Sequence, residues 1–310
     1  MKELIKKITR QTGTVTDTLP FAAILSFLAT LLGMLLSLLL FRFLPVRKLI
    51  DILTGDAAIT DFALQYFEFV GIWIFILLLV FVFKKNRKMW NGLRYNGKGN
   101  SFRSLLFGAL LGFLTNGICV LISWLSGDIK LSFYGFDIRF LLVFVIVVFV
   151  QSGAEELVDR FYLYQKLRRR YRSPLVAILG NALVFALMHG LNPGFTFTAA
   201  LQIFLVAMIF SMFVYYYDAL WMAMAFHASW NFTQNIIFGL PNCGLVSAYS
   251  IFHLEAASAR NGLFYNVGFG VEGSIGACLI LFVLVIVIYL LNRNKAEKND
   301  LWAEETEWDS

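Results

Sequence analysis

The sequence from 151 to 160 reads QSGAEELVDR and continues an apolar, uncharged stretch that begins at residue 140. Its charged residues are Glu155, Glu156, Asp159 and Arg160. A charged side chain near the middle of a membrane span costs about 2.5–3.5 kcal/mol on insertion scales. Four such groups within six positions of an apolar helix therefore indicate a functional site. The surrounding segments are expected to be helices that enclose it.

The composition of the chain favours a membrane protein. Hydrophobic residues make up 59% of the 310 residues, and the mean hydropathy is +0.72, whereas soluble domains are about 45–50% apolar. The three cysteines, Cys119, Cys243 and Cys278, are far apart and form no CxxC motif. Neither a disulfide framework nor a cysteine zinc site is predicted from this spacing. We expect a multi-pass protein of the cell membrane.

Apolar segments of spanning length, in most cases about 17–25 residues, recur along the chain. The predicted spans are about 20–44, 62–83, 104–126, 137–165, 174–191, 195–217, 219–240 and 271–291. All prolines lie at span edges, where the missing backbone N–H does not break a helix. We therefore predict an all-α polytopic membrane protein with about eight transmembrane helices, built as a single membrane domain over residues 1–310.

The distribution of basic residues predicts the orientation of these spans. With the N-terminus in the cytoplasm, the cytoplasmic segments hold 19 Lys and Arg, and the external segments hold 6. An even number of spans returns the chain to its starting side, so both the N-terminus and the C-terminus are expected to be cytoplasmic. The segment 292–310 is accordingly predicted to be a short cytoplasmic tail.

Two further apolar helices carry isolated polar residues. His189 lies in the fifth predicted span, and His227 and Asn231 lie four positions apart in the seventh. A spacing of four places both side chains on one helix face. At about 1.5 Å per residue, these residues and Glu155 lie roughly 13–22 Å from the cytoplasmic ends of their helices. This common depth predicts that the three helices contribute to one site.

These side chains together are suited to hydrolysis. Glu156 and Arg160 are four positions apart and are expected to pair, while Glu155 lies about 100° around the helix and faces another partner. A carboxylate in an apolar pocket beside a neutral imidazole can act as a general base for water. His227 and Asn231 can donate hydrogen bonds to the oxyanion of a tetrahedral intermediate. The expected reaction is hydrolysis of an acyl bond, with peptide bonds at the membrane as the obvious substrates.

The motifs resemble those of the CPBP group, which comprises the type II CAAX prenyl endopeptidases and the bacterial bacteriocin-processing or Abi proteins. In this chain they read Glu155-Glu156-x-x-x-Arg160, Phe185-x-x-x-His189 and His227-x-x-x-Asn231. Their order, spacing and placement on successive apolar helices all match. The resemblance covers residues 104–240, which we interpret as a CPBP-like catalytic core. Asp159 occupies a position to which the family pattern assigns no role.

The resemblance implies a glutamate-dependent intramembrane endopeptidase. Glu155 would activate the attacking water, His189 would help to position it, and His227 and Asn231 would stabilise the oxyanion. The supporting residues would be Glu156 and Arg160. No cofactor is implied. The expected partners are the lipid bilayer and a membrane-associated protein or peptide substrate, and no nucleic acid.

Two other functions are compatible with the sequence. A divalent metal could bind at Glu155, His189 and His227, because two histidines and a carboxylate suffice as zinc ligands, although the HExxH motif is absent. A non-catalytic immunity or scaffold protein of the same fold is the other alternative, with the charged residues acting as a packing cluster. Metal analysis tests the first alternative, and full cellular function of a Glu155→Gln variant would favour the second.

Overall fold

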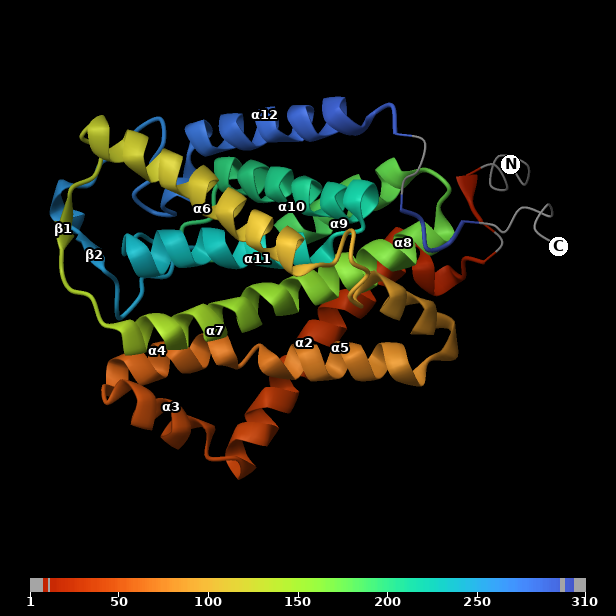
Figure 1. The fold of residues 1–310 in the computed structure, drawn as a ribbon, viewed down its shortest axis with the longest axis horizontal. Helices are drawn as coiled ribbons and strands as arrows, with labels where there is room; N and C mark the ends of the chain where they lie inside the picture. Colours follow the sequence, from red (N-terminus) through yellow and green to blue (C-terminus); the bar gives the residue numbers. More distant parts are fainter. Residues whose placement is uncertain (1–7, 11, 296–298, 304–310) are drawn as a thin grey trace.

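The chain folds into a bundle of apolar helices (Figure 1). The computed structural model describes residues 8–10, 12–295 and 299–303. The helices are α2 (Leu19–Phe43), α3 (Val46–Thr54), α4 (Ala57–Phe67), α5 (Val70–Val82), α6 (Phe102–Leu125), α7 (Ile138–Glu156), α8 (Tyr164–Arg170), α9 (Pro174–Met188), α10 (Phe197–Tyr217), α11 (Leu220–Asn231) and α12 (Ile275–Asn292). Two short strands, β1 (Leu131–Phe133) and β2 (Phe252–Leu254), pair antiparallel with Ser132 opposite His253.

The predicted all-α membrane fold is confirmed. Within the described residues, 6 helices are long and apolar enough to cross a membrane. They run Leu19–Phe43, Ala57–Val82, Phe102–Leu125, Ile138–Arg170, Phe197–Tyr217 and Ile275–Asn292. Every predicted span coincides with a helix, and the two that are shorter are α9 and α11. A π-helical turn, Phe232–Ile237, extends α11 further.

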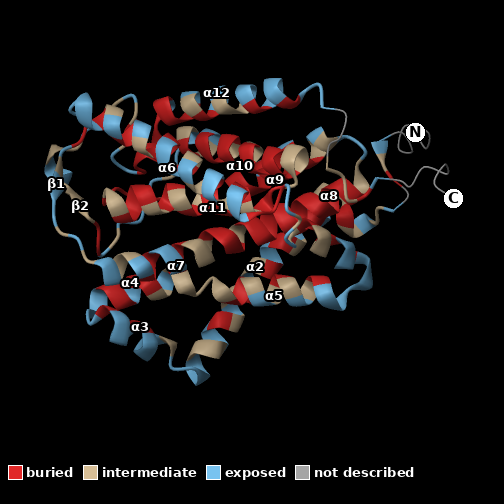
Figure 2. Ribbon diagram, viewed as in Figure 1, coloured by how far each residue is buried: buried red, intermediate tan, exposed pale blue. Residues whose placement is uncertain are grey.

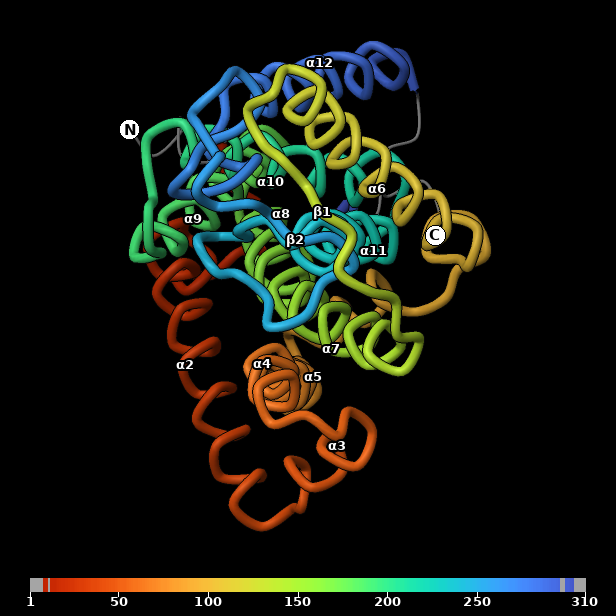
Figure 3. The backbone as a smooth tube through the Cα atoms, turned by 90° about the vertical axis from the view of Figure 1, so that its left-hand side faces the viewer, coloured from red at the N-terminus to blue at the C-terminus, as the bar shows by residue number. Residues whose placement is uncertain are grey.

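The segment between the first two spans differs from the sequence prediction. The second apolar helix begins at Ala57 rather than near residue 62, because Asp56 caps it by accepting a 3.0 Å hydrogen bond from the backbone N–H of Ile59. Before it, α3 is a short helix that the sequence analysis missed, with Ile52 and Leu53 exposed. Figure 3 shows α3 at one edge of the molecule and α12 at the opposite edge. An exposed apolar face on a short helix suits the membrane interface.

The helix that carries the charged motif lies at the centre of the bundle. It runs without a break from α7 through a π-helical segment, Leu157–Leu163, into α8. Figure 2 shows that burial is concentrated in its second half, and every residue of the π segment is buried. Gly153 lets the ring of Trp73 lie directly against this helix, where a Cβ would overlap the indole. Close packing from all sides thus holds the motif in place.

Helix α11, which carries two of the predicted site residues, packs against α6 through small residues. A Cβ added to Gly108 would overlap the carbonyl oxygen of Met222, and one added to Gly112 would overlap that of Phe226. Glycines four positions apart allow two membrane helices to approach closely. The lateral position of α11, and hence of the site, therefore depends on these two glycines.

We predict that Gly112→Leu destabilises the protein by about 3 kcal/mol, because the new side chain meets backbone atoms that cannot move aside. Thermal unfolding in detergent measures the effect. Gly117→Leu is the matched control, since it lies on the same helix and its added Cβ meets open space. Equal unfolding temperatures for the two variants would contradict this account of the helix contact.

A buried ion cluster fastens the start of α2 to α8. The carboxylate of Asp17 lies 2.8 Å from Lys166 Nζ and accepts a 2.9 Å hydrogen bond from Arg169 Nε. Arg169 also donates to Asn86 Oδ1 at 3.0 Å. Burial alone would raise the pKa of Asp17, but the hydrogen bonds from Arg169 and Lys166 hold it well below its usual range. The cluster therefore stays charged and ties three segments together at this end of the bundle.

We predict that Asp17→Asn destabilises the protein by about 3–5 kcal/mol, because it leaves two buried cations without their carboxylate. Because the pKa of Asp17 is depressed in the folded state, this stabilisation is present above the unfolded pKa of about 3.9 and is lost as pH falls below it. Thermal unfolding at pH 7 and at pH 3 measures both effects. The control is Asp61→Asn, whose partner Arg47 is exposed. A cost for Asp17→Asn no larger than that of the control would refute the role of the cluster.

Both ends of the described chain lie at the same end of the bundle. Arg10 and Arg168 pair with Asp300, and Trp302 Nε1 donates a 3.1 Å hydrogen bond to Gln165 Oε1. This arrangement agrees with an even number of membrane crossings. Its assignment to the cytoplasm stays a prediction from the basic residues. Of the predicted tail, 292–310, residues 296–298 and 304–310 lie outside the described residues.

Candidate functional site

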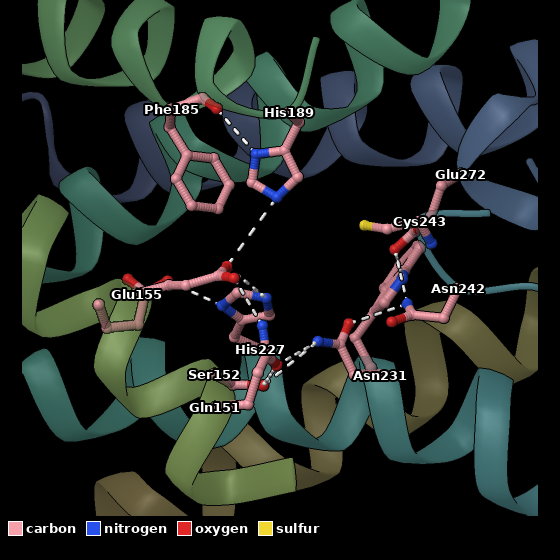
Figure 4. Close-up of polar contacts among 12 residues, drawn as sticks. Gln151, Ser152, Glu155, Phe185, His189, His227, Asn231, Asn242, Cys243 and Glu272 are labelled. Atoms are coloured by element: carbon pink, nitrogen blue, oxygen red, sulfur yellow. Dashed lines mark hydrogen bonds and ion pairs between the residues drawn. The ribbon is translucent and has the colours of Figure 1, made fainter. Parts of the chain in front are cut away.

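The structure brings the predicted site residues of three helices to one cavity of about 330 Å³. Glu155 comes from α7, His189 follows α9, and His227 and Asn231 come from α11 (Figure 4). Side chains of α2, α4, α5 and α10, and of the segment between α11 and α12, complete the wall. Because most of this lining is apolar, the few polar groups operate in a medium where electrostatic interactions are strong.

Glu155 presents one carboxylate oxygen to the cavity. Its Oε1 accepts a 2.6 Å hydrogen bond from Gln151 Nε2, one turn earlier on the helix. Its Oε2 has no hydrogen-bond partner among the described residues. This oxygen lies 3.7 Å from His227 Nε2 and 3.9 Å from His189 Nε2. The carboxylate is thus held by one oxygen, and the other has unused capacity to accept a hydrogen bond.

Glu156, Arg160 and His227 form a hydrogen-bonded triad. Glu156 Oε1 accepts hydrogen bonds from Arg160 Nη1 at 3.0 Å and from His227 Nδ1 at 2.9 Å. Arg160 and Glu156 are completely buried. The guanidinium of Arg160 also lies 4.4 Å from the ring centroid of Phe185 and 5.1 Å from that of Phe210. The predicted pairing of Glu156 with Arg160 is therefore observed, and it extends to the imidazole of His227.

The hydrogen bonds of the two histidines fix which ring nitrogen carries hydrogen when each imidazole is neutral. His189 Nδ1 lies 2.8 Å from the carbonyl oxygen of Phe185. A carbonyl oxygen and the carboxylate of Glu156 only accept, so both Nδ1 atoms must carry hydrogen. In neutral histidine the Nε2 atoms then present lone pairs toward Glu155. Three acceptors face one another, and a water molecule between them could donate to two.

The π-helical segment begins directly after the motif glutamates. In a π-helix the backbone hydrogen bonds join residues five positions apart rather than four. The carbonyl oxygen of Asp159 also accepts a 2.7 Å hydrogen bond from Asn181 Nδ2 on α9. Ser211 on α10 in turn donates to Asn181 Oδ1 at 3.0 Å. Single π-helical turns inside α-helices are frequent at functional sites. Glu155, just before this segment, and Asp159, within it, both line the cavity.

Asn231 is oriented by a chain of amide and carboxylate contacts. Its Nδ2 donates to Ser152 Oγ at 3.2 Å and to Gln151 Oε1 at 3.3 Å. Its Oδ1 accepts from Asn242 Nδ2 at 3.1 Å, and the same Nδ2 lies 3.0 Å from Glu272 Oε1. Because the oxygen is occupied in this way, the donating nitrogen of Asn231 faces the motif helix.

The sequence analysis missed Glu272, which also lines the cavity. Glu272, in a 3₁₀ turn just before α12, accepts from Trp230 Nε1 at 3.1 Å and from the Cys243 backbone N–H at 2.8 Å. The predicted eighth span included position 272, but α12 begins only at Ile275. A carboxylate between Gly270 and Gly273, directly before an apolar run, was the available signal.

The metal site considered in the sequence analysis would use Glu155, His189 and His227 as ligands. Among the residues that the structure describes, no group of three or more His, Cys, Asp or Glu side chains is arranged to hold a metal ion. The Nδ1 atoms of both histidines are engaged with Phe185 and Glu156, so a metal shared by these histidines and Glu155 would have to bind their Nε2 atoms. A metal at this position stays a hypothesis that direct measurement can test.

We predict that Arg160→Ala destabilises the protein by about 3–5 kcal/mol, because it leaves the buried carboxylate of Glu156 without its cation. Abundance in membranes and thermal unfolding in detergent measure the effect. Arg139→Ala is the matched control, since this exposed arginine lies near the other end of the same helix. An Arg160→Ala protein that is as abundant and melts as high as the control would contradict a structural role of the triad.

Comparison with known proteins gives one family match. Residues 137–233 match the family model described as type II CAAX prenyl endopeptidase Rce1-like. The match spans about a third of the chain and lies within the predicted core, 104–240. It contains every residue of the three sequence motifs. No curated protein and no solved structure gives a significant match.

Proposed function

We propose that this multi-pass membrane protein is an intramembrane endopeptidase, because its residues 137–233 match the family model of the type II CAAX prenyl endopeptidase Rce1-like proteins. Its substrates would be membrane-associated proteins or peptides, and Glu155 would be its general base. The observation that carries the proposal is the unpartnered Oε2 of Glu155, which faces two imidazole nitrogens inside an apolar cavity. This is the arrangement required to bind and deprotonate a water molecule.

The attack step begins with a water molecule between Glu155 and His189. The water donates one hydrogen to Glu155 Oε2 and the other to the lone pair of His189 Nε2. Glu155 accepts its proton as the water oxygen bonds to the carbonyl carbon of the substrate, and the electron pair of the C=O bond moves to the oxygen. The product of this step is a tetrahedral intermediate with a negatively charged oxygen.

The oxyanion would be stabilised by Asn231 and His227. The two present contacts of Asn231 Nδ2, at 3.2 and 3.3 Å, are at the long end for N–H···O hydrogen bonds and can yield to a charged acceptor. His227 Nε2 donates only when the imidazole is doubly protonated, because Nδ1 already donates to Glu156. The second proton of this imidazolium would enter from solvent before the substrate binds, and Glu156 would continue to accept the hydrogen bond from Nδ1. Glu156 and Arg160 thus support the site through His227.

Collapse of the intermediate completes the reaction. The C–N bond breaks, its electron pair stays on nitrogen, and the proton held by Glu155 passes to the leaving amine. Glu155 is then a carboxylate again, and the products are a new C-terminal carboxyl group and a new amine. No further reactant is needed.

We predict that Glu155→Gln abolishes peptide cleavage, with a loss of at least about 100-fold, because proton transfer by a positioned base contributes about 10²–10⁴-fold. Cleavage of membrane-inserted peptides by purified protein in liposomes measures the effect. The variant should remain folded, because it removes a charge from an apolar region. Glu255→Gln, in an exposed loop, is the matched control.

Cleavage at the control rate by Glu155→Gln would rule out Glu155 as the base. Absence of cleavage in wild type and variant alike, together with full cellular function of Glu155→Gln, would instead favour a non-catalytic immunity or scaffold role for the same fold.

We predict that removal of divalent metals leaves cleavage unchanged, because the proposed steps use only side chains and water. Elemental analysis of the purified protein and assays after dialysis against a chelator provide the measurement. Loss of cleavage on chelation, restored by zinc, would support a metal at Glu155, His189 and His227 and overturn the mechanism above.

A further inference from the structure

A continuous series of hydrogen bonds joins Glu155 to Glu272 through three amide side chains (Figure 4). Gln151 Nε2 donates to Glu155 Oε1 at 2.6 Å, and Gln151 Oε1 accepts from Asn231 Nδ2 at 3.3 Å. Asn231 Oδ1 accepts from Asn242 Nδ2 at 3.1 Å, and this nitrogen also donates to Glu272 Oε1 at 3.0 Å. We refer to Gln151, Asn231 and Asn242 as the amide relay.

The Glu272 end of the amide relay determines which way Asn242 points. Trp230 Nε1 donates to Glu272 Oε1 at 3.1 Å, and an indole N–H can only donate. This oxygen accepts in the ionised acid and also in the neutral acid with its proton on Oε2. The nitrogen of Asn242, rather than its oxygen, therefore faces Glu272. Its second hydrogen is then directed to Asn231 Oδ1.

The Glu155 end imposes the same polarity. Gln151 must present its nitrogen to Glu155 Oε1, so its own oxygen is left to accept, and Ser152 Oγ also donates to that oxygen at 3.0 Å. A reversed Asn231 would place oxygen against oxygen at Gln151 and nitrogen against nitrogen at Asn242. The amides therefore hold one another, as in other cooperative hydrogen-bond networks.

Asn242 and Glu272 lie outside the three sequence motifs and outside residues 137–233, which match the family model. Asn242 follows the π-helical turn Phe232–Ile237, and Glu272 lies in the 3₁₀ turn Val271–Gly273. Both residues are buried. The second oxygen of Glu272 accepts from the Cys243 backbone N–H at 2.8 Å. The nitrogen of Asn242 and the carboxyl of Glu272 are thus engaged within the chain, so they act through Asn231 rather than on the substrate.

We propose that Asn242 and Glu272 are positioning residues for peptide cleavage, which hold the nitrogen of Asn231 toward the oxyanion. The inference rests on the proposed endopeptidase function and adds two residues to it. Without these contacts the amide of Asn231 can turn and present its oxygen to the oxyanion instead. Because the oxyanion forms only as the reaction proceeds, kcat should fall while substrate binding is retained.

The test measures kcat and KM for one membrane-spanning peptide with the full-length protein in liposomes. Asn242→Leu removes the donor with little change in size, and it should lower kcat about tenfold and keep KM within about twofold, as for loss of one hydrogen bond in the transition state. Glu272→Leu should have the same effect, and Glu272→Gln, which keeps one acceptor oxygen, should lose less. Asn292→Leu is the matched control, because this buried amide on α12 donates to Tyr217 and to its own helix.

A double-mutant cycle separates positioning from a general loss of structure. In an Asn231→Ala background no amide is left to orient, so Asn242→Leu should lower kcat no further. An unchanged kcat for Asn242→Leu, equal losses in both backgrounds, or an equal loss for the control would overturn the positioning role. The endopeptidase itself would stand, provided that wild type cleaves and Glu155→Gln does not.

If wild type and Glu155→Gln both leave the peptide uncut, the proposed function fails, and unfolding in detergent decides whether the relay orients Asn231. Among the described contacts, Asn242 is the link between Glu272 and Asn231. The losses of unfolding free energy for Glu272→Leu and Asn231→Ala should then be less than additive in the double variant. Such coupling supports the relay, and additive losses refute it.

Discussion

The centre of the structure depends on the buried carboxylate of Glu156, which two side chains share as a hydrogen-bond acceptor. Glu156 accepts from both Arg160 and His227, and so connects the motif helix to α11 across the centre of the bundle. None of these groups could be left alone in such a place without a large loss of stability. The arrangement also fixes which nitrogen of His227 carries hydrogen. The requirement to neutralise a buried carboxylate thereby sets the orientation of a side chain that faces Glu155.

Close helix packing fixes the positions of the helices that carry these residues. Gly108 and Gly112 bring α6 against the backbone of α11, and Gly153 admits Trp73 against the motif helix. The π-helical segment after Glu156 contains Asp159, which lines the same cavity as Glu155. Closely packed helices hold the residues of the cavity wall, among which Glu155, Asp159 and Gln202 keep unsatisfied oxygens. The buried pair of Glu156 and Arg160 and the unpartnered Oε2 of Glu155 thus lie within one short stretch of the chain.

Much of the fold could be predicted because apolar length and proline position are local properties. The helical spacing of Glu156 and Arg160 was likewise sufficient to predict their pairing. Helix α3 was missed because its nine residues are too few and too polar to read as a span. The π-helical turn and the role of Glu272 depend on contacts between distant segments, such as those with Trp230 and Asn242, which no local pattern encodes. The sequence thus predicted residues that the fold brings to one cavity, whereas their hydrogen bonds could be read only from the assembled bundle.

The most direct test of the central claim is a structure of the Glu155→Gln protein with an uncleaved membrane peptide. The account predicts the peptide in the cavity, with its scissile carbonyl carbon facing residue 155 and its carbonyl oxygen within hydrogen-bonding distance of Asn231 Nδ2. A water molecule should lie between residue 155 and His189. A peptide bound outside the cavity, or a carbonyl oxygen directed away from Asn231 and His227, would contradict the proposed chemistry.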